Sequence, residues 1–128
     1  MGFILPNAAS IKSEKKGRLM LSTSQARICY DQINKTSLVS LKRSLFQLAT
    51  DYATIRSRWS LMDRQQRNQI DPGRTMAHNA LIDSVNILSR NMIKQEEDNS
   101  WRAILGDDRK VIGDFACYVA LFLALEAR

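Results

Sequence analysis

The sequence predicts an all-α fold, a four- to five-helix bundle with a buried C-terminal helix, formed as a single domain over residues 1–128. Three observations support this prediction. No charged side chain occurs between residues 115 and 125, so a helix there is apolar on every face and needs other helices around it. Residues 38–62 repeat apolar side chains every three or four positions, which indicates a long helix. Two prolines, five glycines and no sustained alternation of Val, Ile and Thr argue against a sheet.

The first helix is expected over residues 23–34, after an N-terminal arm at residues 1–21 that lacks periodicity and that we expect to be mobile. Ser22 and Gln25 have the spacing of a capping box, which satisfies free backbone amides at the start of a helix. The apolar positions of this helix are Ala26, Cys29 and Ile33.

The second helix is expected to follow an N-cap at Thr36 or Ser37. Its apolar seam steps regularly by three and four residues and serves either an intramolecular bundle or a dimer. The other apolar helices of the chain favour the intramolecular use. The seam consists of Leu38, Leu41, Leu45, Leu48, Tyr52, Ile55, Trp59 and Met62.

A third helix is predicted to begin at Asp71-Pro72, because Asp is a favoured N-cap and Pro a favoured first helical residue, and to end near Gln95. A short helical turn then follows Asn99 or Ser100 and ends at Gly106. The apolar positions of the third helix are Ala77, Leu81, Val85, Leu88 and Met92.

The final helix begins after Asp107 and Asp108, whose carboxylates suit the positive end of the helix dipole. One side of it carries small residues, so that another helix can approach closely there. It is too short, and too interrupted by Asp114 and Glu126, to span a membrane. The small side consists of Gly113, Ala116, Ala120, Ala124 and Ala127.

The net charge of +6 is unevenly distributed. Residues 1–62 contain ten Lys and Arg against three Asp and Glu, a net of +7, whereas residues 63–128 contain nine against ten, a net of −1. Such a basic half is either a surface for nucleic acid or anionic lipid, or an ordinary solvated face. We therefore keep nucleic acid as a possible partner of the first half.

The two cysteines, Cys29 and Cys117, have no metal-binding or disulfide spacing, which indicates a reducing environment. The N-terminal residues do not have the pattern of a secretory signal or a myristoylation site. These features predict a cytoplasmic protein. The chain has a single histidine and no paired cysteines, so we expect no metal site. We expect no bound cofactor either.

Arg74 and His78 are four residues apart and therefore neighbours on one helix face. A histidine beside an arginine can serve as a general base next to a phosphate-holding group. The structural alternative is that both side chains bond to carboxylates of the final helix, Asp108 or Asp114, and lock the bundle. We favour this alternative.

Two resemblances add to these observations. The string Arg74-x-x-x-His78-Asn79 remotely resembles the arginine–histidine signature of HEPN-type helical RNases, with a shorter gap here. Residues 71–128 resemble a family of small bacterial proteins of unknown function in two strings, DPGRTMAHNALIDSVNILSR and WRxxLGDDRKxIGDFACY. This second resemblance implies a helical fold and no particular activity. The polar positions it singles out are Arg74, His78, Asn79, Asp83, Arg109 and Asp114.

The sequence contains no Gly-rich phosphate loop and no nucleophile elbow. We therefore expect a non-enzymatic interaction or regulatory module that self-associates, as a homodimer, and that can bind a protein partner. The alternative is a nucleic-acid-binding module, or a HEPN-like RNase that uses Arg74 and His78.

Overall fold

The computed structural model of the chain describes residues 20–128, and this part contains five helices and no strand, which confirms the predicted all-α class. All five helices contribute to one hydrophobic core. The helices are α2 (Thr23–Asn34), α3 (Val39–Trp59), α4 (Arg64–Lys94), α5 (Ser100–Leu105) and α6 (Arg109–Glu126).

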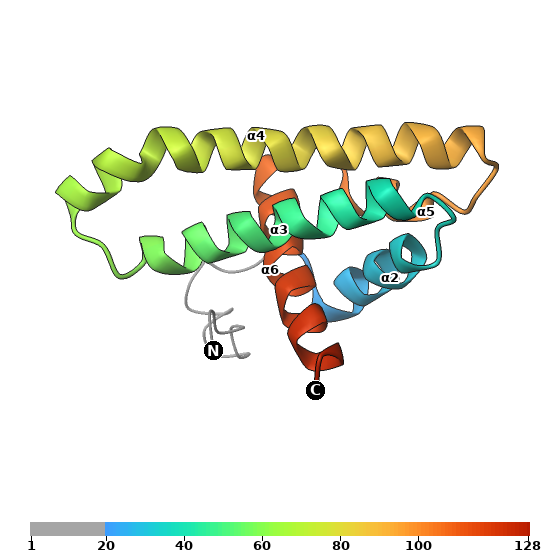
Figure 1. Cartoon of the computed structure of the whole chain (residues 1–128), viewed down its shortest axis with the longest axis horizontal. Coiled ribbons are helices and arrows are strands. Elements are labelled where there is room, and N and C mark those ends of the chain that lie inside the picture. Colours follow the sequence, from blue (N-terminus) through green and yellow to red (C-terminus); the bar gives the residue numbers. More distant parts are fainter. Residues whose placement is uncertain (1–19) are drawn as a thin grey trace.

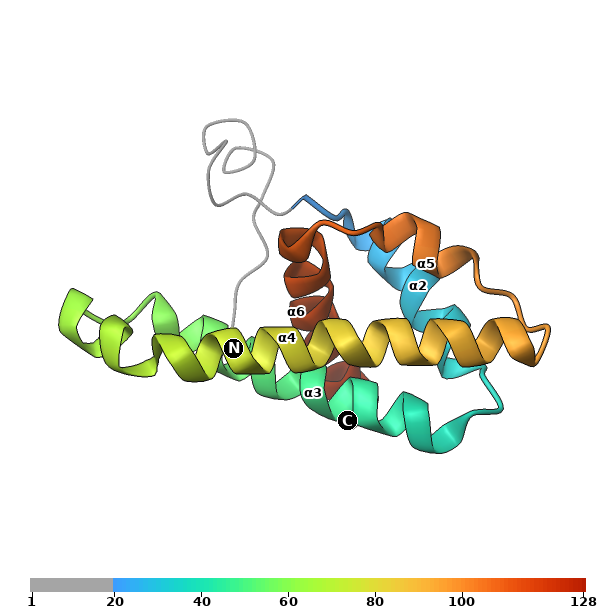
Figure 2. The same ribbon diagram turned by 90° about the horizontal axis from the view of Figure 1, so that it is seen from above.

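The long helices α3 and α4 lie side by side and antiparallel, as a hairpin (Figure 1). Helix α6 crosses this hairpin steeply near its middle and contacts α3 most extensively. Helices α2 and α5 lie together beside α6, against one half of the hairpin (Figure 2). The other end of the hairpin, where α3 connects to α4, projects beyond the remaining described helices.

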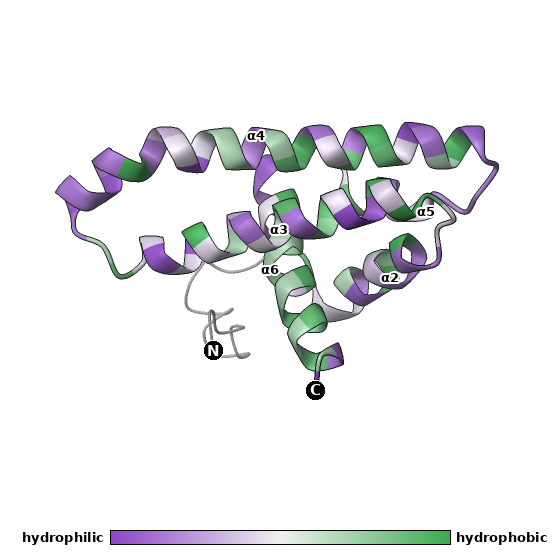
Figure 3. Ribbon diagram, in the orientation of Figure 1, coloured by the Kyte–Doolittle hydropathy of each residue, from purple (hydrophilic) through white to green (hydrophobic). Residues whose placement is uncertain are grey.

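Helix α6 is the buried centre that its composition predicts, and its ribbon is the most continuously apolar of the fold (Figure 3). Residues 112–119 are all buried, while residues 124–128 at its end are exposed. The predicted close approach occurs at Gly113, where a Cβ atom would lie 3.1 Å from the Tyr52 ring. Among the described residues, no helix is both long and apolar enough to cross a membrane.

The α3 seam faces the bundle interior, but only Leu45 and Tyr52 of its eight positions are fully buried. Because α6 covers one side of α3 and α4 the other, the buried face also includes Phe46, Ala49 and Ala53. The predicted N-cap was wrong: Leu38 precedes the helix and makes no side-chain capping bond. The hydroxyl groups of Thr36 and Ser37 donate instead to Glu97 in the connection between α4 and α5.

The predicted start of α4 at Asp71-Pro72 was also wrong. The helix begins at Arg64, where Asp63 and Gln66 form a complete capping box, and Pro72 lies inside it. Proline lacks an N–H and crowds the preceding turn, which bends a helix without necessarily ending it. The axis of α4 changes direction near this end (Figure 1).

At its other end, α4 closes with paired backbone bonds. The amide of Glu96 donates to the carbonyl of Ile93 at 3.0 Å, and that of Glu97 donates to Met92 at 3.0 Å. This is the Schellman arrangement, in which the first residue beyond the cap takes a left-handed conformation that favours glycine. Here Glu96 occupies that position with a φ of 56°.

Helix α2 has its predicted bounds and its predicted Ser22–Gln25 capping box. The expected arm ends earlier than predicted, because Met20 and Leu21 are tied to α6. The Met20 amide donates to Asp114 at 2.7 Å, and the buried Leu21 accepts from Tyr118 through its carbonyl at 2.9 Å. The rest of that predicted arm, residues 1–19, lies outside the described part of the chain.

Candidate functional site

A cavity of about 440 Å³ opens where α3, α4 and the start of α6 meet. Four cationic side chains line it and no carboxylate does, so we name it the cationic pocket. Its lining residues are Tyr52 and Arg56 from α3, Arg74, Thr75 and His78 from α4, and Arg109 and Lys110 from α6.

Arg56 is fixed in this pocket by an ion pair with Asp114, at 2.8 Å between Nη2 and Oδ1. Asp114 is completely buried and also accepts the backbone amide of Met20. The Arg56 side chain is 27% exposed, so part of the guanidinium faces the pocket. A buried carboxylate needs such partners, because leaving one unpaired costs several kcal/mol.

Arg74 lines the pocket from α4, and its predicted bond to Asp108 or Asp114 was wrong. It pairs within its own helix with Asp71, at 3.1 Å, and its guanidinium lies 4.3 Å from the centre of the Trp59 ring. Asp114 is already paired with Arg56, and Asp108 caps α6. The Nε of Arg74 is buried and has no hydrogen-bond partner among residues 20–128.

His78 joins two helices, stacking on Tyr52 with ring centres 4.5 Å apart. Its Nε2 lies 2.8 Å from the backbone carbonyl of Arg109. A carbonyl oxygen can only accept, so Nε2 carries the hydrogen and Nδ1 carries the lone pair. Burial lowers the pKa of His78, and the nearby Arg109, Arg56 and Arg74 lower it further, so the ring is neutral at pH 7. The predicted lock between His78 and the final helix is therefore made by a backbone carbonyl, not by a carboxylate.

Arg109 and Lys110 supply the unneutralised charge of the pocket. The Nη2 of Arg109 donates to Oδ1 of Asn79 at 2.8 Å, a neutral acceptor. Within the described part of the chain neither Arg109 nor Lys110 forms an ion pair. The pocket thus combines two arginines held by carboxylates with two free cations from the first turn of α6.

The six polar positions singled out in the sequence divide into three groups. Arg74, His78 and Arg109 line the pocket. Asn79 and Asp114 stand behind it and hold pocket arginines. The sixth, Asp83, is exposed and does not line the pocket.

Sequence reasoning missed Tyr52, Arg56, Thr75 and Lys110 as pocket residues. One signal could have found Arg56. Asp114 lies in the most apolar helix of the chain, and a buried carboxylate requires a cation from another element. Arg56 was a candidate, because it lies four residues after the seam residue Tyr52 and so shares a face with it.

In residues 20–128, no three His, Cys, Asp or Glu side chains are arranged to hold a metal ion. In comparisons with known proteins, no family model, no curated protein and no solved structure matches this chain. The resemblance of residues 71–128 to a bacterial family, and the remote one to HEPN-type RNases, therefore stay predictions.

Proposed function

We propose that this chain is a non-enzymatic binding module whose cationic pocket takes a phosphate-bearing ligand. One observation supports the proposal: four cationic side chains from three helices converge on one cavity without a carboxylate in its lining. Arginine is suited to phosphate because its planar fork of donors matches the phosphate oxygens. Arg56 and Arg74 are held in place by Asp114 and Asp71, so less side-chain entropy is lost on binding.

Electrostatics also supports an anionic ligand. Burial is the main cause that lowers the pKa of His78, and the positive charges of three nearby arginines lower it further. A bound phosphate would reverse that effect and raise the pKa of His78. The unpartnered Nε of Arg74 is a further buried donor in a residue that lines the cavity.

The phosphate can belong to a small molecule or to a nucleic-acid backbone, and two probes separate these sources. Inorganic pyrophosphate is titrated by calorimetry, and a labelled single-stranded RNA is titrated by fluorescence anisotropy. For RNA the logarithm of affinity falls with the logarithm of salt by about 0.7 per phosphate neutralised, so three or four contacts give a slope of about −2 to −3. If pyrophosphate binds and RNA does not, the ligand is a small molecule. If neither probe binds, the proposal is refuted.

The variant that tests the pocket is Arg109→Gln with Lys110→Gln, which removes its two free charges. We expect this pair to lose most of the affinity for either probe. Its matched control is Arg90→Gln with Lys94→Gln, two exposed positions of α4 outside the pocket, with the same change in net charge. Equal loss in both pairs would mean that only overall charge matters, and would contradict a site at the pocket.

A ribonuclease remains the second candidate, and one observation favours it. His78 is neutral, and its Nε2–H is oriented by the Arg109 carbonyl, which leaves Nδ1 able to accept a proton. The test is cleavage of the same RNA at low salt. If the pocket is catalytic, His78→Gln keeps RNA affinity and abolishes cleavage. If the wild-type protein binds RNA without cleaving it, the binding function stands alone.

A further inference from the structure

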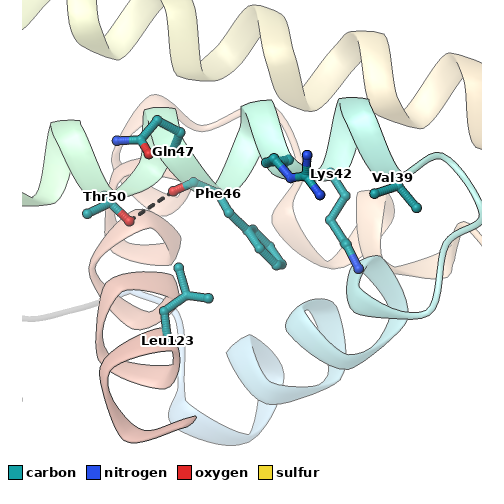
Figure 4. Close-up of a pocket in the computed structure, with 7 residues that line it drawn as sticks. Val39, Lys42, Phe46, Gln47, Thr50 and Leu123 are labelled. Atoms are coloured by element: carbon teal, nitrogen blue, oxygen red, sulfur yellow. Dashed lines mark hydrogen bonds between the residues drawn. The ribbon is translucent and has the colours of Figure 1, made fainter. Parts of the chain in front are cut away.

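A second hollow lies on the molecule away from the cationic pocket, between α3 and the C-terminal half of α6. Its volume is about 310 Å³, and we name it the Phe46 groove. Figure 4 shows Phe46 from α3 and Leu123 from α6 pointing into it, with Lys42 at its edge. Its lining residues are Val39, Lys42, Arg43, Phe46, Gln47, Thr50 and Leu123.

The floor of the Phe46 groove is apolar and firmly supported. Phe46 is 8% exposed and stacks on Tyr30, with ring centres 5.1 Å apart. Leu123 packs against the core as a partly buried residue. Val39 in the groove wall is 48% exposed. Exposed apolar groups that adjoin an apolar hollow are typical of an interaction surface.

The same groove carries two cations without counter-ions. The Nζ of Lys42 donates to the backbone carbonyl and the Oδ1 of Asn34, at 3.1 and 3.3 Å, and both acceptors are neutral. In the part of the chain that the structure describes, neither Lys42 nor Arg43 forms an ion pair.

The carboxylates of Asp51 and Glu126 lie near this end of the bundle, and neither forms an ion pair with Lys42 or Arg43. Asp51 accepts from Gln47 at 2.9 Å. Glu126 accepts from Tyr30 at 2.9 Å and lies 4.0 Å from Arg27. The positive charge of the groove is therefore available to an incoming group.

We propose that the Phe46 groove binds an acidic amphipathic helix of a partner protein. Such a helix places apolar side chains at positions i, i+3, i+4 and i+7 on the groove floor, and carboxylates beside them. Those carboxylates would meet Lys42 and Arg43, which supplies charge complementarity. The groove is at the lower limit of small-molecule pockets, which hold roughly 300–1,000 Å³, but it suits a few side chains of a larger partner.

A second copy of this chain is a poorer occupant. A twofold-symmetric dimer centred on the groove would use the same patch on both copies and bring the positive charges of Lys42 and Arg43 close to the same pair of the other copy. Like charges opposed at an interface cost binding free energy. The Phe46 groove is thus complementary to an acidic surface, not to itself.

The test uses a synthetic peptide of about four helical turns, with leucine at i, i+3, i+4 and i+7 of the pattern and glutamate elsewhere. Its control carries lysine in place of glutamate. Binding to the full chain is measured by calorimetry and mapped by amide chemical shifts. We expect the acidic peptide to bind at least about tenfold more tightly than the basic one, which corresponds to about 1.4 kcal/mol. The shifts should centre on Val39, Phe46 and Leu123.

Protein variants then locate the interaction. Lys42→Glu with Arg43→Glu should weaken the acidic peptide at least about tenfold, and Val39→Asp should do the same through the apolar floor. Arg90→Glu with Lys94→Glu is the matched control, and circular dichroism confirms that each variant is folded. No binding at about 1 mM peptide, shifts away from the groove, or equal effects of both charge reversals would overturn the proposal. So would a dimer that Val39→Asp converts to a monomer, since a second copy would then occupy the groove.

Discussion

Removing Arg56 should destabilise this protein more than its partly exposed position suggests, because the change leaves Asp114 buried without its cation. Breaking a fully buried ion pair by removing one partner costs about 3–5 kcal/mol. Asp114 is 0% exposed, but the Arg56 side chain is 27% exposed, so water can enter the space that Arg56→Ala creates. Asp114 also keeps the Met20 amide at 2.7 Å. We therefore expect a loss at or below the lower end of that range, about 2–3 kcal/mol.

At about 4 °C per kcal/mol for a chain of this length, this loss lowers the melting temperature by about 8–12 °C. The free energy of unfolding is measured by urea titration with circular dichroism at the helical band. Arg58→Ala is the matched control, since Arg58 is exposed in the same last turn of α3. An exposed substitution of this kind stays within about 0.5 kcal/mol.

A double-mutant cycle with Asp114→Asn decides whether the ion pair is the cause. In the Asp114→Asn background no buried charge is left behind, so Arg56→Ala should cost about 1 kcal/mol, the value of one hydrogen bond. The difference between the two backgrounds is then a coupling of about 1–2 kcal/mol. If Arg56→Ala costs the same in both backgrounds, within about 0.5 kcal/mol, the charge-pair argument is refuted.

Four further predictions concern other parts of the molecule. Glu96→Gly should stabilise the protein by about 1 kcal/mol in urea titration, because Glu96 occupies a left-handed position with a φ of 56°; a loss of stability would show that Glu96 makes a contact worth more than this strain. Gly113→Ala should lower the melting temperature despite alanine's higher helix propensity, because its Cβ would lie 3.1 Å from the buried Tyr52 ring; an unchanged or raised midpoint would mean that α3 can move away. Burial lowers the pKa of His78 below 6.5 in the folded protein, so the unfolded chain binds a proton at His78 more strongly. The free energy of unfolding should therefore fall as the pH drops from about 6.5 towards 5. His78→Gln should flatten this pH dependence, and an identical dependence in both proteins would contradict the lowered pKa of His78. The expected homodimer should give about twice 14.6 kDa in light scattering at tens of micromolar. Apolar residues such as Leu61 and Met76, which are 86% and 72% exposed, are available for its interface. The mass of a monomer would refute the homodimer.

The parts of the fold that sequence reasoning found are those whose signals are local. The capping box of Ser22 and Gln25 fixes the start of α2, and the capping carboxylate of Asp108 fixes that of α6. Gly106, with a φ of 64°, ends α5 as expected. In each case the side chain accepts from a backbone amide of the next helical turn, or the residue itself adopts the required backbone conformation, without help from distant segments.

The predicted start of α4 was wrong because two local helix-start signals competed. Asp71-Pro72 is a good helix start, but Asp63 and Gln66 form a capping box earlier in the chain. Within the helix that begins at Arg64, Pro72 removes one backbone hydrogen bond and crowds the preceding turn. Packing of α4 along α3 can offset that loss, and such packing is not visible in a local pattern.

The cationic pocket was predicted only in part, because local spacing does not show how helices pack together. Helical spacing correctly placed Arg74 and His78 on one face, and both line the cationic pocket. Their partners depend on how helices cross, so Arg74 was assigned to the wrong carboxylate. Arg56 was missed because its partner Asp114 is 58 residues away in the chain.

The closeness of α3 and α6 at Gly113 connects the stability of the fold to the shape of the pocket. Where α6 has no side chain, Tyr52 can lie against its backbone, and the next residue, Asp114, reaches Arg56. One turn earlier, the carbonyl of Arg109 meets His78, which itself stacks on Tyr52. Tyr52 and Arg56 therefore both contact α6 at Gly113 or Asp114 and line the cationic pocket. A substitution that separates α3 from α6 should thus weaken anion binding and stability together. Arg109→Gln with Lys110→Gln should weaken binding and cost no more stability than the exposed Arg109–Asn79 hydrogen bond.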